Sequence, residues 1–365
     1  MAKKIFIAAT LQNVGKTTFC LGLIARLKKT FKRIGFIKPI GQRYLMEQGY
    51  KVDEDSVLIE KIFGIGSNLR IKDLSPIAVE KGFTEKYIQG NSAGDYAKLI
   101  LDSYRKVARD NELVIIEGTG HAGVGSVFDL SNATVARLLG SRVILLAPGG
   151  VGRPIDEVVL NKALFDKGRV RLAGVVVNKV IPEKFNKINK LIRVGFKKKN
   201  TPVIGVMPYQ KRLDLPTMRE IMEEVKVPLL CGDENLDASV DKILIGAMEA
   251  RDALRYVENN SLVITPADRL DLLKAVIKLQ TKSKDTRKIS GVVLTGDTKP
   301  NAKILKHLNG LQIPTLAIKT DTFTAVKRVD SIIVKVKPED KEKIRLIVNM
   351  VEKYVDIDMI LKNLT

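Results

Sequence analysis

Short apolar runs alternate with longer amphipathic segments along most of this chain. The runs cover residues 5–9, 34–37, 113–116, 143–147, 172–177 and 203–206, and they are dense in Val and Ile. Such runs, with little polar alternation, are typical of parallel strands that are buried on both faces. Between them, the segments 19–29, 96–109, 155–165 and 185–196 are long enough for crossover helices. The pattern predicts an α/β fold with a doubly wound, mostly parallel sheet.

A second series of elements follows the last of these runs. We expect a helix at 218–225 and a linker at 228–237. Beyond the linker, the pattern predicts strands at 262–264, 289–294, 315–318 and 331–335, and helices at 247–256, 270–280, 301–308 and 338–354. We therefore divide the chain into a domain at 1–228 and a smaller α/β domain at 229–365.

Composition narrows the class of protein. The 365 residues suffice for about two domains, and a hydrophobic content of 45% excludes a largely disordered chain. The formal charge of +21 favours anionic partners without choosing among nucleotides, nucleic acids and acidic lipids. No apolar run reaches the ~18–20 residues of a membrane span, and no signal peptide is recognisable, so we expect no membrane association. Two distant cysteines, Cys20 and Cys231, suit a reducing cytoplasm.

The first apolar run leads into a phosphate-loop motif. Residues 10–17 match G-x-x-x-x-G-K-[ST], except that Thr10 stands in place of the first Gly. In such a loop, backbone N–H groups surround the phosphates, Lys16 neutralises the outer ones and the Thr17 hydroxyl binds Mg²⁺. The predicted nucleotide-binding residues of the loop are Thr10, Asn13, Val14, Gly15, Lys16, Thr17 and Thr18.

Polar residues also close the other predicted strands. Glu117 ends the run 113–116 in the arrangement that places a carboxylate beside Mg²⁺. Lys38 ends the second strand, where it would meet a phosphoryl group or a substrate carboxylate. Asn178 ends the run 172–177 and is positioned to read a purine edge. The guanine-specific pattern would need Asp at 181, where Ile181 stands, so ATP is favoured over GTP.

The sequences Ala9-Thr10, Val14-Gly-Lys-Thr17 and Gly35-Phe-Ile-Lys-Pro39 together resemble dethiobiotin synthetase. The resemblance implies ATP and Mg²⁺ as ligands, with Lys16 and Lys38 as catalytic residues and Pro208 beside the base. It also implies that Thr17, Asp55 and Glu117 hold the metal. Asp53 and Glu54 are adjacent carboxylates, and they leave the assignment of Asp55 open.

A longer stretch, 117–132, resembles the N-terminal region of long phosphate acetyltransferases instead. The same resemblance extends to 149–156, 160–163, 246–248, 253–256, 264–269, 291–296 and 321–323, of which the last five lie in what would be a DRTGG-type domain. The chain ends where the acetyltransferase domain of that family would begin, so we expect no acetyl-CoA chemistry from it.

The diaminopelargonate pocket of dethiobiotin synthetase is not expected here. The sequence Ile40-Gly-Gln-Arg43 and the imidazole of His121 stand where that family has small residues. We predict a different second ligand, a small anionic metabolite, bound by Lys38, Gly118, His121 and Arg153. His121 is equally consistent with a structural role in its loop.

These features lead to a principal hypothesis and two alternatives. The principal one is a cytoplasmic, homo-oligomeric, Mg-ATP-binding regulatory protein that senses a nucleotide or metabolite. The first alternative is an ATP-dependent ligase that activates an unidentified carboxylate. The second, a nucleic-acid-binding ATPase, rests on charge alone. The basic run 184–199 lacks a nucleic-acid-binding module and reads as a solvated helix face, so specific nucleic-acid binding is not expected.

Overall fold

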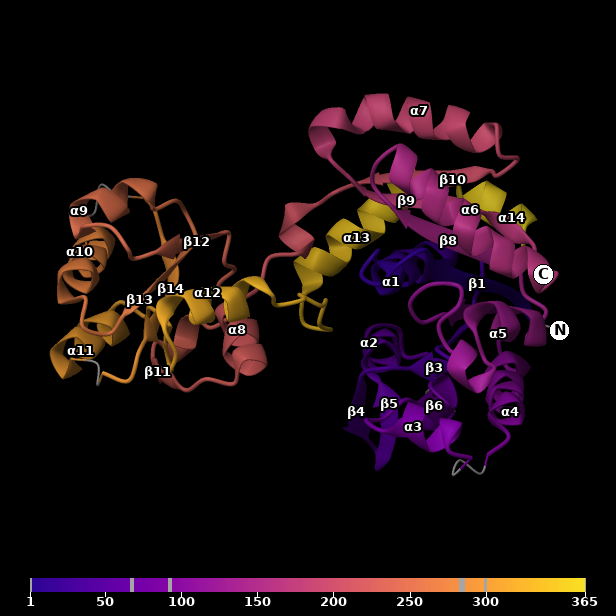
Figure 1. The fold of residues 1–365 in the computed structure, drawn as a ribbon, viewed down its shortest axis with the longest axis horizontal. Helices are drawn as coiled ribbons and strands as arrows, with labels where there is room; N and C mark the ends of the chain where they lie inside the picture. Colours follow the sequence, from indigo (N-terminus) through magenta and orange to yellow (C-terminus); the bar gives the residue numbers. More distant parts are fainter. Residues whose placement is uncertain (1, 66–68, 91–93, 282–285, 299–300, 365) are drawn as a thin grey trace. The chain divides into compact units, whose positions relative to one another are not determined.

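The structure is a computed structural model, and it describes residues 2–65, 69–90, 94–281, 286–298 and 301–364. The chain forms two compact units, one of residues 1–210 together with 336–365 and the other of residues 211–335 (Figure 1). This division differs from the predicted one at 228/229. The chain leaves the first unit after Gln210 and returns to it at Val336, so the C-terminal segment does not belong with the second unit.

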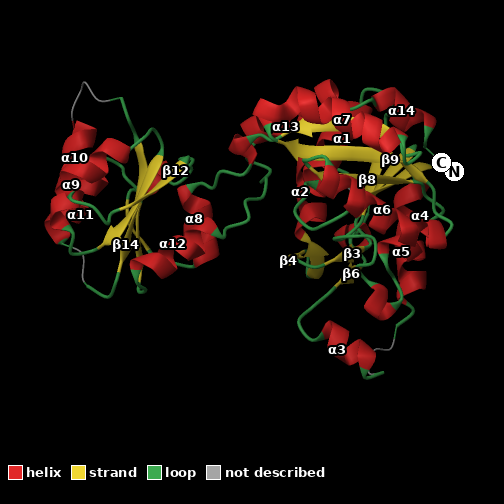
Figure 2. Ribbon diagram, turned by 45° about the horizontal axis from the view of Figure 1, so that its top comes forward, coloured by secondary structure: helices red, strands yellow, loops and turns green. Residues whose placement is uncertain are grey.

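A six-stranded parallel sheet forms the centre of the first unit. Its strand order is β10-β9-β8-β1-β7-β2, and every neighbouring pair is parallel. The prediction of a doubly wound parallel sheet is confirmed, and helices cover both of its faces (Figure 2). The strands are β1 (Lys3–Ala9), β2 (Ile34–Ile37), β7 (Leu113–Glu117), β8 (Val143–Pro148), β9 (Leu172–Val180) and β10 (Val203–Pro208). The helices include α1 (Lys16–Leu27), α4 (Tyr96–Arg109), α5 (Asn132–Leu138), α6 (Gly152–Lys167) and α7 (Phe185–Lys197).

The segment between β2 and β7 contains small elements that the apolar pattern did not predict. A hairpin of two short antiparallel strands turns at Gln48 and Gly49, which both have positive φ (51° and 79°) as tight hairpin turns require. A helix that begins at Glu54 then follows a capping Asp53. The elements are β3 (Ile40–Gly41), β4 (Tyr44–Glu47), β5 (Tyr50–Asp53), α2 (Glu54–Phe63), β6 (Ile77–Ala78) and α3 (Phe83–Ile88).

The C-terminal helices α13 (Lys341–Tyr354) and α14 (Ile357–Lys362) complete the first unit. Helix α13 packs on α1 at Gly22, where an added Cβ would lie 2.4 Å from Cγ2 of Val351. Glu352 pairs with Arg26 and Lys29 of α1, at 3.8 Å and 2.7 Å. This packing explains why the predicted domain 229–365 was wrong at its C-terminal end: the apolar face of α13 is covered by the helix that follows the phosphate loop.

The second unit has a five-stranded sheet in the order β11-β15-β14-β13-β12. Only β11 is antiparallel to its neighbour among the strands of this sheet. Helices α9 to α11 pack on one face, and α8 and α12 pack on the other. The strands are β11 (Leu229–Cys231), β12 (Lys242–Ile245), β13 (Ser261–Pro266), β14 (Ile289–Thr295) and β15 (Thr315–Ile318). The helices are α8 (Met218–Val225), α9 (Ala250–Ala253), α10 (Leu270–Thr281), α11 (Ala302–Gly310) and α12 (Thr322–Asp330).

Two predictions for this unit were wrong. Residues 228–237 are not a linker, because they contain β11 and a 3₁₀ turn at Asp233–Asn235. Residues 331–335 are not a strand, since β11 already occupies the free edge of β15. None of the helices in the described part of the chain combines the length and apolar composition that a membrane crossing requires.

Candidate functional site

The phosphate loop connects β1 to α1, and its conformation depends on one glycine, Gly15. Gly15 has φ +97°, a conformation that favours glycine, and its carbonyl accepts the first hydrogen bond of α1, from Phe19 N at 2.9 Å. A Cβ at this position would lie 2.7 Å from Nδ2 of Asn178. The loop therefore places the N-terminus of α1 at the carboxyl ends of the strands. The free backbone N–H groups and the dipole of a helix N-terminus bind phosphate favourably.

The side chain of Asn178 holds this loop in place through hydrogen bonds. Its Nδ2 donates a 2.8 Å hydrogen bond to the carbonyl of Val14, and its Oδ1 accepts one of 2.9 Å from Lys179 N. The side chain that we predicted to read a base edge thus has a structural role in the loop. Pro208 ends β10 opposite Val180 of β9, so it lies at the same edge of the sheet.

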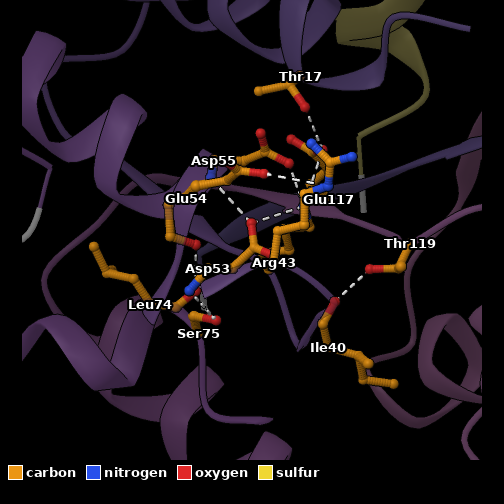
Figure 3. Close-up of polar contacts among 12 residues, drawn as sticks. Thr17, Ile40, Arg43, Asp53, Glu54, Asp55, Leu74, Ser75, Glu117 and Thr119 are labelled. Atoms are coloured by element: carbon orange, nitrogen blue, oxygen red, sulfur yellow. Dashed lines mark hydrogen bonds and ion pairs between the residues drawn. The ribbon is translucent and has the colours of Figure 1, made fainter. Parts of the chain in front are cut away.

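Thr17 and Glu117 meet where β1 and β7 end. The Thr17 hydroxyl donates a 2.8 Å hydrogen bond to Oε1 of Glu117 (Figure 3). The strand register explains this meeting, since Glu117 pairs with Ile7 near the carboxyl end of β1. The hydroxyl and the carboxylate that were predicted to hold Mg²⁺ are therefore neighbours.

Lys38 lies among three carboxylates. Its Nζ lies 2.8 Å from Oδ1 of Asp53 and 3.9 Å from Oε1 of Glu117, and it forms a close ion pair with Asp55. All four side chains are buried. Glu54, the third carboxylate of its segment, instead turns toward Arg43, at 4.0 Å. The structure thus brings both Asp53 and Asp55 to Lys38, and it leaves Glu54 outside the cluster.

Burial and the mutual field of these groups shift their pKa values. Burial and, to a smaller extent, the nearby Asp55 together raise the pKa of Glu117 to about 7, against the opposing effects of Lys38 and Lys16. For Lys16, burial lowers the pKa, and Glu117 offsets only part of that effect. Burial also tends to lower the pKa of Lys38, but Asp55, Glu117 and Asp53 outweigh it and hold the ammonium charged.

Two buried carboxylate oxygens in this cluster, Oδ2 of Asp53 and Oε2 of Glu117, have no hydrogen-bond partner. Among the described residues, no group of three or more Asp, Glu, His or Cys side chains is arranged so that it could hold a metal ion by itself. A magnesium ion that arrives with a nucleotide needs fewer protein ligands, because phosphate oxygens and water fill the remaining positions. Thr17, Asp55 and Glu117 fit that smaller requirement.

Three residues that we predicted to bind a second ligand have other neighbours. A Cβ on Gly118 would lie 2.6 Å from both Oδ1 of Asn132 and Cε1 of Phe6, so close packing requires a glycine there. His121 is exposed, and its Nδ1 accepts a 3.2 Å hydrogen bond from Gly123 N. Arg153 is exposed and donates to Glu157 at 2.7 Å. Of the four predicted residues, Lys38 is the one placed in the carboxylate cluster.

Glu157 is a residue that sequence reasoning missed. Its carboxylate accepts hydrogen bonds from both Arg153 Nε and the Thr10 hydroxyl, the latter at 2.8 Å. This contact explains why a threonine replaces the first glycine of the motif: its hydroxyl joins the loop to α6.

Asn161 and Asn132 were missed as well. Asn161 accepts a 2.8 Å hydrogen bond from Ala122 N, and Asn132 accepts one of 3.1 Å from Thr119 N, so both hold the loop that follows Glu117. A signal for Asn161 exists in the sequence, because it falls on the same helical face as the buried Val158 and Phe165.

A phosphate loop after the first strand and a carboxylate at the end of the neighbouring strand define a P-loop fold. Residues 3–217, more than half of the chain, match the family AAA_26, which is described as an AAA domain. The chain belongs to this family. Residues 220–332 match the DRTGG domain, so the predicted second domain type is confirmed.

Curated relatives are similar over nearly the whole chain. A phosphate acetyltransferase of Nitratidesulfovibrio vulgaris is 26% identical over 98% of this chain and 51% of its own length. One of Synechocystis is 27% identical over 100% of this chain and 52% of its own length. The chain therefore spans about half the length of these relatives.

Two similar solved structures are distant likenesses of this chain. A MinC:MinD cell division protein complex of Aquifex aeolicus has a TM-score of 0.37 at 15% identity, over 58% of this chain and 84% of that chain. The CBS and DRTGG domains of Clostridium perfringens pyrophosphatase, complexed with diadenosine tetraphosphate, have a TM-score of 0.27 at 15% identity. That match covers 48% of this chain and 87% of that chain.

Proposed function

We propose that this protein binds ATP with Mg²⁺ at the phosphate loop and acts as a nucleotide- or metabolite-sensing regulator. One observation carries the proposal: Thr17 and Glu117 are hydrogen-bonded beside a buried, unpartnered Glu117 oxygen at the N-terminus of α1. A hydroxyl and a carboxylate in this position match the way P-loop proteins hold the magnesium of a nucleotide.

Each residue has a part in this proposal. Lys16 addresses the outer phosphates, and Thr17, Asp55 and Glu117 hold the metal, which neutralises phosphate charge when it is bound. Lys38 balances the carboxylates in the free protein. If Asp55 and Glu117 hold the metal, Asp53, which lies 2.8 Å from Lys38 in the free protein, would remain a partner of Lys38, and the ammonium could also meet a terminal phosphate or an anionic second ligand.

The regulatory part rests on the extent of the similarity. Both the P-loop domain and the DRTGG domain are matched, and the relatives are phosphate acetyltransferases of about twice the length. We propose that this chain resembles the part of those enzymes that senses a ligand. The two free thiols, Cys20 and Cys231, fit a reducing compartment, so we further propose a cytoplasmic location, and we expect a homo-oligomer.

A turnover assay separates the regulator from the ligase. ATP hydrolysis is measured with Mg²⁺, first alone and then with a panel of small carboxylic acids and diamines. The proposal expects Mg-ATP binding with negligible turnover under all of these conditions. Turnover that rises with one acid, and that Lys16→Ala and Lys38→Ala both abolish, would establish the ligase instead. The exposed Lys198→Ala is the matched control, since it removes a lysine outside the site.

A further inference from the structure

A groove lined by four arginines lies at the amino ends of strands in the first unit's sheet. The phosphate loop lies at the carboxyl ends of the same strands. Two turns form it: one joins α5 to β8 and contains Arg142, and the other joins α6 to β9 and contains Arg169 and Arg171. Arg137, in the last turn of α5, completes the set, which we call the arginine groove. Because β8 and β9 are parallel to β1, turns that enter these strands lie away from the loop that leaves β1.

The lining of the groove is enriched in arginine over lysine. Its lining contains four arginines but no lysine and no acidic residue, although lysines outnumber arginines 42 to 20 in the chain. Arg142 Nη1 donates to Oδ1 of Asn363 at 3.0 Å, which is a neutral partner. Across the described residues, none of the four guanidinium groups pairs with a carboxylate.

Backbone hydrogen bonds fix both turns before any ligand arrives. Ser141 N donates to the Ala136 carbonyl at 2.9 Å at the end of α5, and Val170 N donates to the Phe165 carbonyl at 2.9 Å at the end of α6. Val143 N donates to the Arg171 carbonyl at 3.0 Å and joins one turn to the other. Arg169 has φ +56°, a left-handed conformation that costs an arginine free energy. The positions of the four Cα atoms are therefore set by the fold.

Four like charges around one hollow repel one another, and an anion among them offsets that repulsion more directly than solvent screening does. Guanidinium groups match phosphate oxygens in pairs, and they bind phosphate with more directional contacts than ammonium groups do. The volume of about 280 Å³ is slightly below the ~300–1,000 Å³ of typical ligand pockets, which suits one or two phosphate groups better than a whole nucleotide. We propose that the arginine groove is a second anion site, which binds a diphosphate group, as pyrophosphate or as the diphosphate end of a nucleotide.

The test uses the full chain with Lys16→Ala, so that the phosphate loop does not contribute and failure of the proposed ATP site does not affect the result. Pyrophosphate is titrated calorimetrically into this protein and into the same protein with Arg137→Gln and Arg171→Gln. We expect the double change to weaken pyrophosphate binding at least about tenfold. The control replaces Arg105 and Arg109 of α4, which pair with Asp102 and Asp110, by Gln and removes the same charge.

The outcomes are distinct. Equal weakening by the groove pair and the control pair would overturn the proposal, because net charge would then explain the binding. Citrate that binds as tightly as pyrophosphate would overturn it as well, since the site would not select phosphate. A pyrophosphate affinity that only the groove pair lowers supports the proposal, and a titration with ADP then shows whether the site accepts a diphosphate that carries a nucleoside. Thermal unfolding of each variant verifies that the fold is retained.

Discussion

The hydroxyl of Thr17 donates a 2.8 Å hydrogen bond to Oε1 of Glu117, and this contact joins the phosphate loop to the end of β7. In the proposed complex both groups turn to the metal. We predict that Thr17→Ala and Glu117→Gln each weaken Mg-ATP binding by about 10–100-fold and leave the weaker binding of metal-free ATP almost unchanged. Titrations of ATP in Mg²⁺ and in EDTA measure the two affinities. Equal loss in both solutions would show a general disturbance of the loop.

Lys16 addresses phosphate in this account whether or not a metal is present. We therefore predict that Lys16→Ala lowers the affinity for ATP at least about tenfold in Mg²⁺ and in EDTA alike, because the contact of a partly buried ammonium group with phosphate is lost. Fluorescence titration with a labelled ATP analogue measures this. An unchanged affinity in both solutions would remove Lys16 from the site, and Lys198→Ala provides the comparison.

Gly22 is required by helix packing. A Cβ there would lie 2.4 Å from Val351 Cγ2 and 3.1 Å from the Ile347 carbonyl oxygen. We expect Gly22→Ala to destabilise the first unit by about 1–3 kcal/mol through overpacking, and Val351→Ala in the same chain to restore part of the loss. Urea unfolding of the single and double variants measures the coupling. Strictly additive effects would contradict the packing of α13 on α1.

The raised pKa of Glu117 makes stability depend on pH. The folded state holds this proton up to about pH 7, whereas the unfolded chain releases it near the usual glutamate pKa of 4.5. Folding therefore loses stability from this group as the pH rises through that interval. Gln does not titrate, so the variant keeps its stability over this interval. At 1.36 kcal/mol per pKa unit, the free energy of unfolding of Glu117→Gln relative to that of the natural protein should rise by at most roughly 3 kcal/mol from about pH 4.5 to about pH 8.

The measurement is urea unfolding in EDTA without nucleotide, at both pH values. Glu112→Gln is the control. The backbone N–H groups of Arg33 and Lys32 hold the pKa of Glu112 below its usual value, so this carboxylate loses its contribution only as the pH falls below that value, and the effect of Glu112→Gln should stay nearly constant between about pH 4.5 and about pH 8. Parallel pH profiles for the two variants would contradict the assignment of a buried, protonated Glu117.

The parts of the fold that apolar patterning determines were predictable. Strands such as β7 and β8 are continuous apolar runs, and the phosphate loop has its own sequence motif. The hairpin β4–β5 was not predictable from this pattern, because its strands are four residues long and largely exposed. The return of α13 to α1 was missed since no local signal reports which helix will cover an apolar face.

Some residues of the candidate site were likewise predictable from the sequence, and others were not. Lys16, Thr17 and Glu117 belong to motifs, so their placement followed from the strands around them. Asp53 was predicted only as an alternative to Asp55, and its contact with Lys38 depends on an unpredicted helix that Asp53 caps. Glu157 has no motif at all, because its partner Thr10 is 147 positions away in the chain.

One titration tests the central claim most directly. ATP is titrated into the full chain by calorimetry, once with excess Mg²⁺ and once with EDTA, and the Glu117→Gln variant is measured under both conditions. The account predicts saturable binding that Mg²⁺ strengthens at least about tenfold in the natural protein and much less in the variant. Absence of binding in Mg²⁺, or equal affinity with and without the metal in the natural protein, would contradict it.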